Sequence, residues 1–192
     1  MARIAISTNL SLDGVVQDPD GQESFRHGGW FGRYGGADLE PWRKVMLDEA
    51  RGTEAMLLGR RSDDWFASRW LSRTGEWADL LNGAPKYVVS STAERVAWGD
   101  GTLLRGDPVS EVSKLKAEVD GVVLILASYQ LTHTLIDHDL VDQLRLTVFP
   151  VVIGEGDRLF GSTHDVKAWR LVDATTIGDD LVHLVYELDR GA

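Results

Sequence analysis

The sequence contains no cysteine among its 192 residues. This absence excludes disulfide bonds, thiol nucleophiles and cysteine-ligated metals, and it is typical of a cytoplasmic protein. Apolar runs are short as well: none approaches the ~20 residues of a membrane helix, and the start of the chain has too few apolar residues for a signal peptide. We therefore expect a cytoplasmic protein that has no membrane partner.

Basic residues are scarce. The chain has 20 Lys and Arg against 30 Asp and Glu, which gives a net charge of −10. Such a charge argues against nucleic acid and anionic membranes as partners. A local group of arginines can still bind a small anion. The hydrophobic content of 43% is that of a globular protein, and we expect a single domain over residues 1–190.

Several well-known motifs are also missing. The chain has no G-x-G-x-x-G fingerprint, no Walker loop and no G-x-S-x-G elbow. His133 and Asp137 are four residues apart on one predicted helix, but no third metal ligand stands at motif spacing. We therefore expect no metal site.

The strongest pattern that is present lies between Gly121 and Gly156. The apolar run Val122–Leu126 predicts a strand that is covered on both faces. A helical repeat of leucines follows, with Ser128 at the expected N-cap position, and a second strand is expected over residues 143–153. Strand, helix and strand in this order predict a βαβ unit with parallel strands.

The rest of the chain alternates in the same way and ends differently. Two apolar segments, Trp169–Thr176 and Leu181–Leu188, flank a Gly-Asp-Asp turn and predict an antiparallel hairpin. With roughly seven strands and four helices in all, the pattern predicts an α/β fold whose central sheet is mixed but mostly parallel and is flanked by helices. The other expected strands span residues 3–10, 55–58, 85–90 and 102–105, and helices are expected over 39–51 and 108–119 and from Ser62 onward.

Candidate binding residues follow the expected strands, where an open α/β sheet binds its ligands. Gly59 and Arg60 precede a helix and suit a phosphate, although a capped surface helix explains them equally well. The hydroxyl run Ser90, Ser91 and Thr92 could bind phosphate or ribose, but it is more often an ordinary turn. At the central junction, backbone N–H groups would do the binding, and the residues there are Ala127, Ser128, Tyr129 and Gln130.

Three further residues have a possible chemical role. Asp13 lies in a turn after the first strand and could orient a substrate or relay a proton, although Asp-Gly is also a common turn pair. Trp30 lies in a long glycine-rich loop over residues 17–36, and loops of that length are often functional. We place Trp30 and Trp65 beside a bound substrate.

Taken in order, these blocks resemble a known family. They are Ser11–Gly14, Leu57–Arg61, Pro85–Ser90 and, as the most specific, Leu140–Leu146 with its continuation Pro150–Gly154. The chain is similar to the dihydrofolate reductase-like fold, and more closely to stand-alone relatives of the C-terminal reductase domain of the bifunctional deaminase–reductases of riboflavin biosynthesis. The resemblance covers almost the whole chain.

The resemblance implies an NADPH-dependent oxidoreductase, often a homodimer, like the 5-amino-6-(5-phosphoribosylamino)uracil reductases. It implies that Gly59 and Arg60 meet the cofactor's phosphates, that residues 90–92 lie at its 2′-phosphate end, and that the 127–130 junction holds the pyrophosphate and nicotinamide half. Asp13 would face the substrate. The alternative is a non-catalytic binding protein that kept this fold but lost cofactor affinity, because the junction lacks the family's usual glycines.

Overall fold

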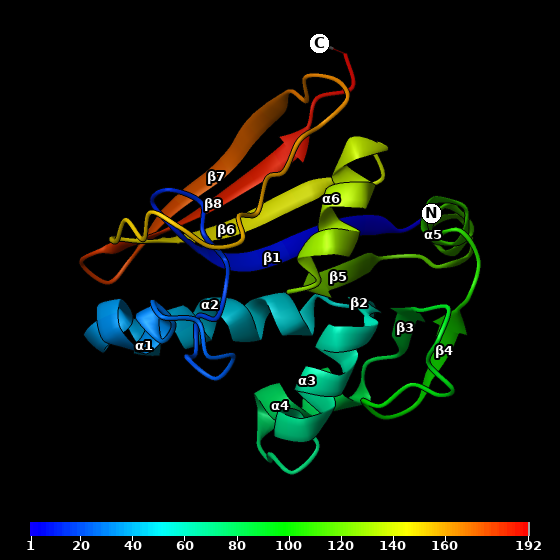
Figure 1. The fold of residues 1–192 in the computed structure, drawn as a ribbon, viewed down its shortest axis with the longest axis horizontal. Coiled ribbons are helices and arrows are strands. Elements are labelled where there is room, and N and C mark those ends of the chain that lie inside the picture. Colours follow the sequence, from blue (N-terminus) through cyan, green and yellow to red (C-terminus); the bar gives the residue numbers. More distant parts are fainter. Residues whose placement is uncertain (192) are drawn as a thin grey trace.

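The computed structural model describes residues 1–191 and has one eight-stranded sheet with helices on both faces (Figure 1). The order of the strands across the sheet is β4-β3-β2-β5-β1-β6-β8-β7. The strands are β1 (Arg3–Ser11), β2 (Ala55–Gly59), β3 (Lys86–Val89), β4 (Gly101–Leu104), β5 (Val122–Leu126), β6 (Gln143–Phe149), β7 (Trp169–Ile177) and β8 (Leu181–Leu188). The helices are α1 (Trp30–Gly35), the 3₁₀ turn η1 (Gly36–Asp38), α2 (Leu39–Arg51), α3 (Arg60–Trp70), α4 (Glu76–Gly83), α5 (Pro108–Glu118) and α6 (Tyr129–Asp137).

The sheet is mixed and mostly parallel, as the sequence predicts. Strands β1 to β6 all pair in parallel, whereas β8 is antiparallel to both β6 and β7. The predicted C-terminal hairpin is therefore confirmed. The predicted parallel arrangement of β5 and β6 is confirmed too, but β1 lies between these two strands.

Alternate side chains of the inner strands pack on opposite faces of the sheet, as the two-residue repeat of a strand requires. Leu57 of β2 belongs to a core that includes residues of α5 and α6. Its neighbours Met56 and Leu58 belong to a second core that includes Phe66 and Trp70 of α3. The sheet thus separates α5 and α6 on one face from α3 and α4 on the other.

A third group of apolar side chains holds α1 and α2 against the strands at the other end of this second face. Trp42 and Met46 of α2 cluster there with Trp30 and Phe149. The Trp42 Nε1–H group donates a hydrogen bond to Asn9 Oδ1 of β1 at 2.9 Å. This bond joins α2 to β1, and Figure 1 shows α2 running alongside the sheet near β1.

Some predicted boundaries were wrong. Strand β6 ends at Phe149 rather than at residue 153, because Pro150 follows and cannot donate a ladder hydrogen bond. Helix α3 starts at Arg60 with Gly59 as its N-cap, not with Ser62. The structure has eight strands and six α-helices among residues 1–191. The two helices beyond the expected four are α1, which lies in a segment expected as a loop, and α4, which lies in a segment expected as irregular or a short helix. None of these helices is long and apolar enough to cross a membrane.

Candidate functional site

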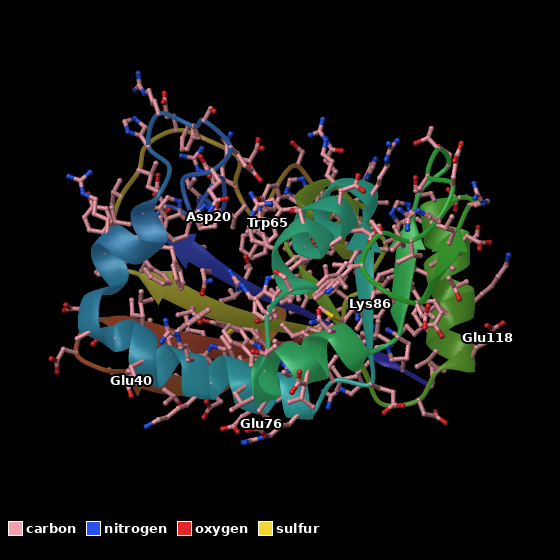
Figure 2. All side chains as sticks on the ribbon, turned by 90° about the horizontal axis from the view of Figure 1, so that it is seen from below. Asp20, Glu40, Trp65, Glu76, Lys86 and Glu118 are labelled. Carbon is pink, nitrogen blue, oxygen red and sulfur yellow. The ribbon has the colours of Figure 1, made fainter. Side chains whose placement is uncertain are left out.

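A cleft of about 920 Å³ opens at the ends of β2 and β5 and beside residues 7–9 of β1. One wall comes from the starts of α3 and α6, a second from Trp42 and Met46 of α2, and the rim from the loop after β1. Figure 2 shows Asp20 of that loop close to Trp65 of α3, and both residues line the cleft. The volume is at the upper end of the range for small-molecule sites.

The topology explains why the cleft lies here. Strands β2 and β5 are neighbours in the sheet, but the helices that follow them lie on opposite faces, α3 on one and α6 on the other. Two parallel strands whose connections diverge in this way leave a crevice at their carboxyl ends. Both helix N-termini open on this crevice, and each presents unpaired backbone N–H groups and the positive end of a helix dipole.

The junction between β5 and α6 has an unusual backbone. Ala127 and Ser128 have φ angles of 53° and 62°, although neither is a glycine. This left-handed conformation is disfavoured for residues with a Cβ atom. Both residues line the cleft, together with Gln130. The chain thus adopts here the conformation that glycines would adopt at no steric cost.

Ser128 does not cap its own helix with its side chain, contrary to the sequence-based prediction. Its hydroxyl oxygen instead accepts a hydrogen bond from the Gly59 N–H group at 3.0 Å. The start of α6 is therefore joined to the start of α3 across the cleft's inner end. A Cβ atom added at Gly59 would meet only the Ser128 side chain, at 3.8 Å, so the space in front of Gly59 is open.

Arg60 lies at the outer part of this wall, and 55% of its side chain is exposed. Its guanidinium donates a hydrogen bond to Thr92 Oγ1 at 2.9 Å and lies 3.7 Å from the carboxylate of Asp64. Residues 90–92 are not part of the cleft wall, and the Ser90 hydroxyl accepts hydrogen bonds from the Thr92 and Ala93 N–H groups in its own turn. Among these hydroxyl residues, Thr92 is the one that Arg60 connects to the cleft.

Asp63 faces away from the cleft, although it lies in the first turn of α3. Its two carboxylate oxygens accept hydrogen bonds from the Ala97 and Trp98 N–H groups at 2.7 and 3.0 Å, and the residue is buried. Its charge is thus used to hold the segment between β3 and β4. Asp64, the next residue, lies 3.7 Å from the Arg60 guanidinium.

The Tyr129 ring forms part of the cleft wall and also packs against the core beneath α6. Its hydroxyl donates a hydrogen bond to the Val16 carbonyl oxygen at 3.2 Å. Burial raises the pKa of this phenol above its ordinary value, and the carboxylates of Glu23 and Asp157 add to the rise. Tyr129 therefore stays neutral and connects α6 to the loop after β1.

Aromatic side chains line the half of the cleft that lies away from the junction. Trp65 is half-buried on α3, and the Arg69 guanidinium lies 4.3 Å from its ring centroid. Arg69 also donates hydrogen bonds to Gln22 Oε1 and lies 4.0 Å from the Asp20 carboxylate. Trp65 lines the cleft, and its contact with a substrate stays a prediction. The sequence analysis did not single out several other residues of the cleft wall: Asn9, Trp42, Met46, Phe66, Trp70 and Trp77.

The sequence contains a signal for four of these residues. Trp42 and Met46 are four residues apart, and so are Phe66 and Trp70, which places each pair on one helix face. That spacing predicts burial and does not reveal that a cleft borders the same face. Only the tertiary packing around α4 brings these pairs together, because Trp77 of α4 contacts both Trp42 and Trp70.

Asp13 does not line this cleft, and its role toward a substrate stays a prediction. Its carboxylate accepts hydrogen bonds from the Ile153 and Gly154 N–H groups at 3.0 and 2.8 Å and from the Ser11 hydroxyl at 2.7 Å. Burial opposes the charge, but these hydrogen bonds outweigh it and hold the pKa of Asp13 well below its ordinary value. Asp13 thus joins the turn after β1 to the segment after β6.

Trp30 is a core residue, which corrects the prediction that it lies beside a bound substrate. It is 1% exposed, its ring meets Phe149 edge to face, and its Nε1–H group donates a hydrogen bond to the Gln17 carbonyl oxygen. The glycine-rich segment before it folds into helix α1 at Trp30, so the indole is turned inward. The loop residues that do line the cleft come earlier, at positions 17–23.

Comparisons with known proteins agree with this geometry. The model of the RibD C-terminal domain family matches residues 2–183. The uncharacterized protein YyaP of Bacillus subtilis (strain 168) is 30% identical over 191 residues, which cover 96% of this chain and 94% of YyaP. Both matches span the strands and helices that form the cleft.

Solved structures show the same fold. A protein of Shewanella sp. PV-4, whose name associates it with riboflavin biosynthesis, superposes with a TM-score of 0.74 at 20% identity, over 99% of this chain and all of its own. The dihydrofolate reductase of Enterococcus faecalis, in complex with NADP(H) and RAB-propyl, superposes with a TM-score of 0.62 at 14% identity, over 97% and 96% of the two chains. The predicted dihydrofolate reductase-like fold is therefore confirmed.

Proposed function

The chain belongs to the RibD C-terminal domain family, and on that premise we propose that it is an NADPH-dependent reductase. Its reaction is hydride transfer to a small polar heterocycle or to a carbonyl or imine compound. The reduced nicotinamide supplies the hydride when it is bound. The protein supplies the binding site, the orientation of the two molecules and a site from which water is excluded.

One observation carries the proposal: the N-termini of α3 and α6 open on the same cleft at the ends of neighbouring parallel strands. A dinucleotide cofactor has two backbone phosphates, and a helix N-terminus binds phosphate through its free N–H groups and its dipole. The Gly59–Ser128 hydrogen bond fixes the two N-termini relative to each other. A pair of anion sites at fixed separation suits a pyrophosphate-containing ligand.

The residues of the cleft fit such a cofactor. Ala127 and Ser128 already have the left-handed backbone that turns main-chain groups toward a ligand, and nothing but the Ser128 side chain lies in front of Gly59. Arg60, Ser128 and Gln130 would hold the phosphates. Arg60 and Thr92 lie at the exposed end of these phosphate-binding residues and would hold the 2′-phosphate that distinguishes NADPH from NADH.

The aromatic half of the cleft would hold the substrate. Trp42, Trp65 and Phe66 offer flat apolar surfaces there, and Asn9 adds a polar group that is held by Trp42. Such a mixture of aromatic walls and few fixed polar groups is typical of sites for small molecules. The 5-amino-6-(5-phosphoribosylamino)uracil type of heterocycle is one test substrate.

A non-catalytic binding protein is the second candidate, and the junction favours it. Cβ atoms at Ala127 and Ser128, together with the Tyr129 ring, leave less room at the main chain than glycines would. In that case the cleft would bind a small molecule without the nicotinamide cofactor. The open space in front of Gly59 argues for the reductase.

Tryptophan fluorescence discriminates between the two candidates, because Trp42, Trp65, Trp70 and Trp77 line the cleft. The reductase predicts saturable quenching by NADPH at micromolar concentration and weaker quenching by NADH. It also predicts NADPH oxidation with one of a panel of heterocycles, carbonyl compounds and imines. An absence of quenching by both nucleotides would reject the reductase and leave the binding protein.

Homodimer formation is part of this proposal. Strand β7 is at one edge of the sheet, and Leu171 and Val172 on it are about half exposed. An edge strand with exposed apolar side chains is a surface on which a second copy can pair. Light scattering of the purified protein across a dilution series tests this part, with a monomer at every concentration as the contrary result.

A further inference from the structure

One amide group on the floor of the cleft has unused hydrogen-bond donors. Strand β1 contributes Ser7, Thr8 and Asn9 to the cleft lining. The Ser7 hydroxyl faces Met46 Sδ at 4.0 Å, and the Thr8 hydroxyl donates a hydrogen bond to the Asn9 carbonyl oxygen at 3.3 Å. Within residues 1–191 the side-chain nitrogen Asn9 Nδ2 donates to no other group, and it is not enclosed by the protein. Asn9 is thus the floor residue whose donors remain free for a ligand.

Trp42 fixes which end of this amide meets the cleft. An indole N–H group can only donate, so the atom that it meets at 2.9 Å is the amide oxygen, Asn9 Oδ1. The Nδ2 group of Asn9 therefore points away from the indole nitrogen. Trp42 is held in turn, because it is 8% exposed and its ring meets those of Phe31 and Trp77 edge to face. The two amide N–H donors consequently have their orientation set before a ligand binds.

Asn9 lies at the boundary between the two halves of the cleft. Leu126, the last residue of β5, pairs with Ser7 of β1. Asn9 is two residues further along β1, so its side chain is on the same face of the sheet as Ser7 and just beyond the end of β5. The junction begins there with Ala127, and Trp42 begins the aromatic half. A reacting group that lies between the cofactor and the aromatic walls would meet this amide.

The floor of the cleft offers donors but no acid. The acidic residues of the described cleft wall are Asp20, Glu23 and Asp157, and all three lie in the loops of the rim. A protonated imine or a basic heterocycle would place its own N–H group and its positive charge against the Asn9 donors, with no carboxylate beside it. A carbonyl oxygen has two lone pairs and can accept from both N–H groups. The floor therefore favours a neutral acceptor.

We propose that the substrate is a neutral carbonyl compound and that Asn9 binds its oxygen. The inference deepens the proposed reductase function and rests on it. Hydride transfer from the reduced nicotinamide forms a C–H bond at the carbonyl carbon and breaks the π bond, whose electron pair moves to the oxygen. The Asn9 N–H groups donate hydrogen bonds to that oxygen, and these bonds strengthen as negative charge develops on it. The oxygen then takes a proton from water at the rim, which leaves an alcohol and a hydroxide ion.

Binding of a carbonyl probe without cofactor tests the site itself. Acetophenone and α-methylstyrene have nearly the same shape, but the first has a C=O group where the second has C=CH₂. In an NMR titration, the wild type should bind acetophenone roughly three- to tenfold more tightly, the value of a neutral hydrogen bond. Acetophenone should also shift the side-chain amide signals of Asn9, which are identified by their loss in Asn9→Asp. Equal affinities, no binding of either probe or unmoved signals would overturn the proposal.

Asn9→Asp separates the donors from the rest of the side chain. The carboxylate keeps the volume and an acceptor for Trp42 but has no N–H group, so the preference for acetophenone should disappear. Gln22→Glu is the matched control, because Gln22 also lines the cleft and its Oε1 accepts a hydrogen bond from Arg69. The control undergoes the same change from amide to carboxylate and should keep the wild-type preference. A preference that survives in Asn9→Asp would contradict the role of Asn9.

Trp42→Phe tests the positioning role of Trp42. The variant keeps an aromatic ring in the wall but lacks the N–H group that orients Asn9, so the two ends of the amide can exchange places. The ratio of the two probe affinities should then fall towards one. A purely structural Trp42 would weaken both probes equally and leave that ratio unchanged. Circular dichroism establishes that each variant is folded, and Trp42→Phe still tests the proposal if Asn9→Asp is not.

Turnover and cofactor binding distinguish this proposal from the reductase assignment. With a carbonyl substrate, Asn9→Asp should lower kcat about 100-fold and leave the affinity for NADPH unchanged in the fluorescence titration. A loss of NADPH affinity with unchanged kcat would place Asn9 in the cofactor site and overturn the proposal. A protein that ignores NADPH but prefers acetophenone loses the reductase assignment and keeps the carbonyl site. A protein that oxidises NADPH with imines alone keeps the reductase and loses the carbonyl assignment.

Discussion

The Ser128 hydroxyl oxygen accepts a hydrogen bond from the Gly59 N–H group at 3.0 Å. The two residues are 69 positions apart in the chain and belong to neighbouring strand ends whose helices leave to opposite faces of the sheet. This bond requires Ser128 to point away from its own helix, which it does in a left-handed conformation with φ of 62°. The geometry of the cleft's inner end thus depends on a backbone that L-residues rarely adopt.

Ala127→Gly should stabilise the protein. Ala127 has a φ of 53°, and its side chain makes no hydrogen bond. The substitution therefore removes the steric cost of the left-handed backbone without removing a hydrogen bond. The gain is reduced by the greater chain entropy of glycine in the unfolded state, which leaves about 0.5–1 kcal/mol. Urea denaturation measures the free energy of unfolding. The matched Ser128→Gly variant also loses the hydrogen bond to Gly59, so its gain in stability should be smaller. A decrease in stability in Ala127→Gly would contradict the strain argument.

Arg60→Ala should weaken NADPH binding by about 1.5–3 kcal/mol, the range for hydrogen bonds to a charged group. Arg60 lines the cleft and is partly exposed, so its loss should leave the fold intact. Fluorescence titration measures the affinity. Arg43→Ala is the control, because Arg43 is exposed on α2 and outside the cleft wall. An unchanged affinity in Arg60→Ala would remove Arg60 from the binding site.

Asp13→Ala should lower stability and leave nucleotide binding unchanged. The substitution removes the acceptor for the Ile153 and Gly154 N–H groups and for the Ser11 hydroxyl. We expect a loss of about 1–3 kcal/mol in the free energy of unfolding. Denaturation and an NADPH titration of the same sample give both quantities. Lost binding with unchanged stability would return Asp13 to the site and disprove its structural role.

Asp142 should make stability depend on pH. Its carboxylate accepts hydrogen bonds from the Ile4 N–H group, Lys116 and Arg190. Burial opposes the charge, but these partners outweigh it and lower the pKa of Asp142 in the folded protein. A carboxyl group whose pKa is lowered in the folded state stabilises the protein at pH values above the pKa of the unfolded state, which is about 3.9 for Asp. That contribution is lost as the pH falls through the lower folded value.

Asp142→Asn therefore should cost about 2–3 kcal/mol at pH 7, as the loss of charge-assisted hydrogen bonds predicts. The difference between wild type and variant should shrink below roughly pH 4. Denaturant titrations at pH 7, 5 and 3.5 measure it. A difference that stays constant over this range would show that the Asp142 charge does not contribute.

The candidate site was less predictable than the fold, and Trp30 and Trp65 show why. Both are tryptophans in segments that were expected to border a ligand. Trp30 lies in the core beside Phe149, whereas Trp65 lines the cleft. Which side of an indole meets solvent depends on the segment that packs over it, and that segment is distant in sequence. Gly59 and Ser128 are a stronger case, because their hydrogen bond joins residues that are 69 positions apart and no spacing rule connects them.

The sequence by itself determined most of the elements, because the pattern of apolar residues sets a strand or helix locally. The unbroken apolar runs of β2 and β5 and the helical spacing in α2 and α6 are properties of neighbouring residues, and turn residues such as Gly178 set the final hairpin. The tertiary structure alone decided which polar groups share an environment. Asp63 and Asp13 accept hydrogen bonds from distant backbone N–H groups, and Ser128 accepts one from Gly59. The physical reason is that a buried polar group must find a partner in space, and the partner's place in the chain is irrelevant to that requirement.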